Sequence, residues 1–66
     1  MFQMLLKRVK ELNEQVNMLR NNGEYACSVH LQAGCMGILE CLYASGELTI
    51  EEKESLIIEL QKRENN

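Results

Sequence analysis

The chain has 66 residues, of which 45% are hydrophobic, and its formal net charge is −3. This composition is too apolar for a disordered chain, and the length allows one domain at most, predicted over residues 1–66. A core this small leaves little net stability, so we expect disulfides, a metal or oligomerisation to add to it.

The charge is distributed unevenly, with +2 on residues 1–22 and −5 on residues 23–66. A nucleic-acid-binding protein normally shows a basic face and a high pI. The four bases of the first segment share one helix with two acids, which is typical of a solvated helix face: Lys7, Arg8, Lys10 and Arg20. Nucleic-acid binding through this segment is therefore disfavoured and is kept only as an alternative.

The first ten residues contain no long apolar run and no small-residue cleavage site, so we expect no signal peptide. No stretch approaches the ~20 apolar residues of a membrane span. We therefore expect a cytoplasmic protein that does not enter a membrane and keeps its three cysteines reduced.

Two breaks that contain glycine, at residues 21–23 and 45–46, divide the chain into three segments with helical patterns. The first helix is predicted over about residues 2–20. Its apolar residues recur at the a and d positions of a heptad: Phe2, Leu5, Val9, Leu12, Val16 and Leu19. Such a stripe packs along another helix at a shallow angle, as in a bundle.

The second helix, predicted over about residues 24–45, is apolar around most of its circumference. Its two main stripes are Tyr25, Val29, Gln32, Met36, Leu39 and Tyr43, and Cys27, Leu31, Cys35, Ile38 and Leu42. A helix that is apolar nearly all round is a buried helix. Two neighbours from the same chain can cover only part of it, and a monomer tolerates an exposed apolar patch of only a few hundred Å². The remaining face therefore needs a partner.

The third helix, predicted over about residues 50–63, begins at Thr49-Ile50-Glu51-Glu52, which fits the capping box. The predicted fold class is therefore all-α. It is a helical hairpin plus a shorter third helix, a three-helix unit that assembles as a homodimer or a higher oligomer.

Small residues on the second helix favour close contact with another helix. Gly34 and Gly37 lie inside it, where each costs roughly 1 kcal/mol relative to alanine. We predict an interface formed by the heptad stripe and these small residues: Phe2, Leu5, Val9, Leu12, Val16, Leu19, Ala33, Gly34 and Gly37.

The residues that could carry chemistry are sparse. Cys27 and His30 could face one metal ion, but structural zinc takes four ligands and a second cluster is missing within one chain. Two chains could still supply this pair twice across an axis. Cys35 and Cys41 lie too far along the helix from Cys27 and from each other for a disulfide. No aspartate is present to orient a base, so we predict no catalytic residue, no cofactor and no enzyme activity.

The predicted function is that of a small non-catalytic helical interaction protein, an adaptor or inhibitor that binds a larger protein, or a protein that self-assembles. The alternative is a homo-oligomeric small-molecule-binding protein with a pocket between the second helices of neighbouring chains. The polar and amphipathic residues that could line this pocket are Tyr25, His30, Gln32, Glu40 and Tyr43.

Overall fold

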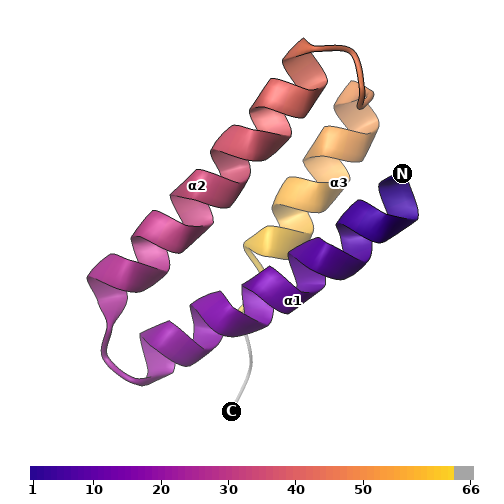
Figure 1. The fold of residues 1–66 in the computed structure, drawn as a ribbon. Helices are drawn as coiled ribbons and strands as arrows, with labels where there is room; N and C mark the ends of the chain where they lie inside the picture. Colours follow the sequence, from indigo (N-terminus) through magenta and orange to yellow (C-terminus); the bar gives the residue numbers. More distant parts are fainter. Residues whose placement is uncertain (64–66) are drawn as a thin grey trace.

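A computed structural model describes residues 1–63, which form three helices packed against one another (Figure 1). The helices are α1 (Phe2–Asn21), α2 (Tyr25–Ala44) and α3 (Ile50–Leu60). The predicted all-α hairpin with a shorter third helix is confirmed. Residues 64–66, which end the predicted domain, lie outside the described residues. No helix of the described part is both long enough and apolar enough to cross a membrane.

Both glycine breaks end a helix, as their sequence indicates. Gly23 and Gly46 have φ angles of 81°, a left-handed conformation that glycine adopts without a steric penalty. After α1, the N–H of Glu24 donates to the Leu19 carbonyl at 2.9 Å and the N–H of Gly23 donates to the Arg20 carbonyl at 3.1 Å. An equivalent pair of bonds ends α2. These bonds satisfy carbonyls that the helix leaves without partners, and they fix the reversals of the chain.

The start of α3 is the predicted capping box. The N–H of Glu52 donates to Thr49 Oγ1 at 3.1 Å, and the N–H of Thr49 donates to Glu52 Oε1 at 2.9 Å. The predicted end of this helix, near residue 63, is wrong, because α3 ends at Leu60. Residues 61–63 are polar and exposed, so no apolar contact stabilises a further turn.

The core lies where the three helices meet. Its buried apolar side chains, within the described residues, are Val9, Val16, Cys35, Leu39, Leu48, Leu56 and Leu60. Leu48 belongs to the loop between α2 and α3, and no helical pattern in the sequence singled it out. A core of this size supports only a marginal net stability.

Two side-chain amides bind the last residue of α3 and the residue two positions after it. Nδ2 of the buried Asn17, from α1, donates to the Lys62 carbonyl at 3.0 Å. Nε2 of Gln32, from α2, donates to the Leu60 carbonyl at 3.2 Å. Because the last carbonyls of a helix have no partner within it, these bonds connect the end of α3 to both longer helices.

Candidate interaction surface

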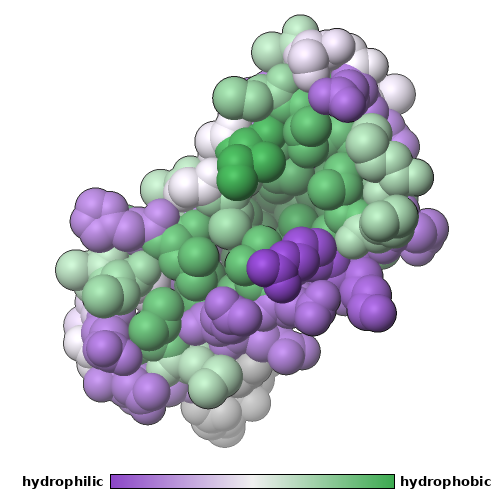
Figure 2. Space-filling view, in the orientation of Figure 1, coloured by the Kyte–Doolittle hydropathy of each residue, from purple (hydrophilic) through white to green (hydrophobic). Residues whose placement is uncertain are grey.

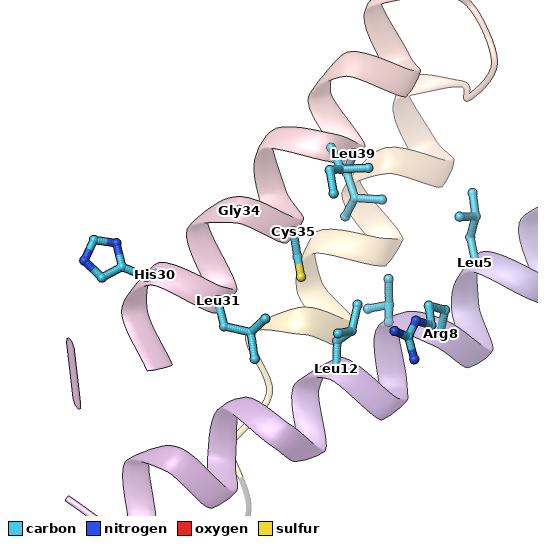
Figure 3. Close-up of a pocket in the computed structure, with 10 residues that line it drawn as sticks. Leu5, Arg8, Leu12, His30, Leu31, Gly34, Cys35 and Leu39 are labelled. Carbon is cyan, nitrogen blue, oxygen red and sulfur yellow. The ribbon is translucent and has the colours of Figure 1, made fainter. Parts of the chain in front are cut away.

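An apolar groove of about 470 Å³ lies between α1 and α2 (Figure 2). Residues from both helices line it: Leu5, Arg8, Val9, Leu12, His30, Leu31, Gly34, Cys35, Ile38 and Leu39. Figure 3 shows Leu12, Leu31 and Leu39 directed into the space between the two helices, whereas the imidazole of His30 points away from it. The groove exists because the facing flanks of the hairpin are apolar and α3 does not cover them.

The groove offers little polar chemistry. Arg8 is the only permanently charged residue among the described residues that line it. Burial raises the pKa of the Cys35 thiol above its ordinary value, and the nearby charge of Arg8 acts in the opposite direction with a smaller effect. A thiol that stays protonated is a weak nucleophile. Burial therefore weakens Cys35 as a nucleophile.

The outer side of α2 is exposed. Only Ser28, Cys35 and Leu39 of this helix are buried, so its two neighbours from the same chain cover only part of its circumference, as expected from the sequence. The physical reason is that α1 and α3 cover one side of α2 and no third neighbour covers the other. Val29 and Ile38 are 60% and 62% exposed as a result.

Along this exposed side runs a row of five small residues and one histidine that we call the α2 seam. Its members are spaced 3, 4, 3, 4 and 3 residues apart: Cys27, His30, Gly34, Gly37, Cys41 and Ala44. All six are exposed, and none carries a permanent charge. A methyl group added at Gly34 or Gly37 would meet no other atom of the described chain within 4 Å. The α2 seam adjoins the groove through His30 and Gly34, and we call the two together the α1–α2 face.

The heptad stripe of α1 is divided between the core and this face. Val9 and Val16 are 4% and 0% exposed, so their assignment to an interface with another molecule is corrected: they belong to the core of the chain itself. Three other residues of the stripe are half-buried against that core: Phe2, Leu5 and Leu12. Leu19 is also half-buried and lies in a shallow depression at the end of α1. The residues that line this depression are Gln15, Met18, Leu19 and Asn22. The three small residues of α2 that were assigned to the interface are all exposed: Ala33, Gly34 and Gly37.

The structure does not bring the five predicted ligand-lining residues together. His30 lines the groove, whereas Gln32 is bonded to the end of α3 and Tyr25 is exposed at the start of α2. Glu40 and Tyr43 face α3, where Lys53 lies 3.1 Å from Glu40 Oε1 and 4.6 Å from the centroid of the Tyr43 ring. Within one chain these five residues do not line one pocket, and the pocket between neighbouring chains stays a prediction.

The three cysteines are free: Cys27 and Cys41 are exposed and Cys35 is buried. Among residues 1–63, no group of three or more His, Cys, Asp or Glu side chains is placed to hold a metal ion. The bases of α1 do not form an uninterrupted face either, because successive helix positions are ~100° apart and acids lie among them.

No known protein family, no curated protein and no solved structure matches this chain. Sequence reasoning identified the glycines of the seam but missed Arg8, Leu31 and Ile38 as residues of one groove. A signal for the groove was present. Once the first two helices are paired as a hairpin, the apolar residues on their adjoining flanks must lie opposite one another.

Proposed function

We propose that this chain is a non-catalytic interaction protein that binds another protein chain through the α1–α2 face. The observation that carries the proposal is the apolar groove, which continues onto an exposed and uncharged row of residues on α2. Exposed apolar surface of this kind is unfavourable in water, and covering it with another chain removes that cost.

The composition of the face supports the same function. The centres of protein interfaces are enriched in methionine, aromatic residues and arginine, and they are depleted in lysine and acids. Arg8 is the charged residue of the groove, and the described residues that line it include no lysine and no acid. Lys53 and Glu40 lie outside this face, because they pair with each other between α2 and α3.

The proposal is tested by photo-cross-linking in the cells that produce the protein. One variant carries benzoylphenylalanine in place of Ile38 in the groove, and the matched control carries it in place of Ile58 on α3. The two side chains are 62% and 60% exposed, so they differ in location and not in accessibility. We expect a covalent adduct with a protein at position 38 and none at position 58. No adduct at position 38, or equal adducts at both positions, would overturn the proposal.

A further inference from the structure

The turn between α1 and α2 contains Asn22, the only asparagine of the sequence that is followed by glycine. Asparagine is thermolabile, because the backbone nitrogen of the next residue can attack its side-chain amide carbon. Glycine in the next position favours this attack, since it has no side chain to hinder the approach and its backbone is flexible. Asn22 and Gly23 are both exposed, and Asn22 lines a shallow depression at the surface. The chain therefore carries a reactive pair at an accessible position.

The other asparagines of the described chain are less suited to this reaction. Asn13, Asn17 and Asn21 all belong to α1, and each is followed by a residue with a larger side chain than glycine. Asn17 is buried as well, and its Nδ2 group donates to the Asn13 carbonyl at 2.9 Å and to the Lys62 carbonyl at 3.0 Å. Inside a helix the backbone nitrogens are also held by the bonds of the helix itself. Asn22, just beyond the helix, is the asparagine with the least hindered neighbour.

We propose that Asn22 is a site of spontaneous deamidation and that the turn which ends α1 controls its rate. In the first step the backbone nitrogen of Gly23 attacks Cγ of Asn22 and forms a cyclic imide. The Cγ–Nδ2 bond breaks, and ammonia leaves with the proton that the Gly23 nitrogen gives up. Water then opens the imide. Cleavage between the Gly23 nitrogen and Cγ gives aspartate, whereas cleavage between this nitrogen and the main-chain carbonyl carbon gives isoaspartate, in which the chain runs through Cγ.

The folded turn opposes the first step. The N–H of Gly23 donates to the Arg20 carbonyl at 3.1 Å, and the N–H of Glu24 donates to the Leu19 carbonyl at 2.9 Å. The ψ angle of Asn22 is 2°, which places the Gly23 nitrogen beside the backbone nitrogen of Asn22 and away from its side chain. Attack therefore requires a rotation about the Cα–C bond of Asn22, and this rotation breaks both bonds. The reaction proceeds from the opened turn, so its rate depends on how often the turn opens.

Both products weaken the end of α1. Each places a carboxylate at the C-terminal end of the helix, where the helix dipole is negative and an added negative charge is unfavourable. Isoaspartate also adds one atom to the main chain before Gly23, so the two hydrogen bonds of the turn no longer fit together. This turn carries the chain from α1 to α2 (Figure 1). Deamidation therefore loosens the hairpin between whose helices the groove lies.

Peptide mapping by mass spectrometry, after incubation of the purified full chain at mildly alkaline pH, tests the site. We expect the mass gain of an amide converted to a carboxyl at Asn22 before any gain at Asn13, Asn17 or Asn21, with isoaspartate among the products. Asn22→Gln keeps the amide but lengthens the side chain, which disfavours ring closure, so it should remove the modification. Asn21→Gln, at the exposed neighbouring position, is the matched control and should leave the rate at Asn22 unchanged. Earlier modification of Asn21, or an equal rate at residue 22 in Asn22→Gln, would overturn the assignment.

Two variants of α3 test the control by the turn in one solvent. Leu56→Ala removes a side chain with 0% exposure and Ile58→Ala one with 60% exposure, so a urea concentration exists at which the first variant is unfolded and the second is still folded. At this concentration we expect Asn22 to deamidate about tenfold faster or more in Leu56→Ala than in Ile58→Ala. Equal rates would overturn the control by the turn. The isoaspartate form, separated by chromatography, should unfold at a lower urea concentration than the unmodified protein, and an unchanged midpoint would overturn the loosening of the hairpin.

Discussion

Replacing Asn17 by aspartate should destabilise the fold strongly at neutral pH. The Nδ2 group of Asn17 donates to the Asn13 carbonyl at 2.9 Å and to the Lys62 carbonyl at 3.0 Å, and the side chain is only 3% exposed. A carboxylate at this position has no proton to donate to either carbonyl. A buried group left unsatisfied costs about 1–3 kcal/mol, and the remaining contact of Arg20 with the side-chain oxygen at 3.0 Å offsets only part of it. We expect a net loss of about 1–2 kcal/mol, against a total stability of about 3–10 kcal/mol for a chain of this length.

Urea denaturation, at one protein concentration and at several pH values, measures this loss. The facing carbonyls and the burial favour the protonated form of the introduced carboxyl, and Arg20 acts in the opposite direction. We expect the first two effects to be larger, so that the pKa lies above its value in the unfolded chain. The destabilisation is therefore complete above the raised pKa, and it is lost as the pH falls below the unfolded value of about 3.9. Gln15→Glu adds the same charge at an exposed position of α1 and should change stability by less than about 0.5 kcal/mol. If Asn17→Asp were as stable as this control at pH 7, Asn17 would not hold the end of α3.

Three further outcomes follow from the described contacts. Leu56→Ala removes a side chain with 0% exposure and should cost about 2–5 kcal/mol in a denaturant melt, whereas Ile58→Ala, at a 60% exposed position of the same helix, should cost less than about 0.5 kcal/mol. Thr49→Ala removes the N-cap of α3 and should cost about 1 kcal/mol, with Thr49→Ser close to wild type; an unchanged melt would show that α3 does not depend on this cap. Cys35 is buried and the pKa of its thiol is raised, so we expect it to react with a thiol reagent at neutral pH more slowly than the exposed Cys27. Peptide mapping of the labelled protein measures the two rates. Equal rates would contradict the burial of Cys35.

Local signals in the sequence were sufficient to place the helices. The glycines at positions 23 and 46 end α1 and α2, because their left-handed conformation depends only on the absence of a Cβ. The Thr49–Glu52 capping box starts α3, because both of its hydrogen bonds join residues three positions apart. The one misplaced boundary, the end of α3, depends on tertiary contact, since residues 61–63 have helix-forming side chains but nothing apolar to pack.

The sequence by itself determined that the chain is helical, where its three helices begin and which helix has more apolar surface than one chain can cover. Only the tertiary structure decided how that surface is divided. It buried Val9 and Val16, turned Gln32 and Glu40 toward α3, and left the groove and the α2 seam uncovered. Helical periodicity states which residues share a face of a helix. It does not state the direction in which that face points, because that direction depends on where the other two helices pack.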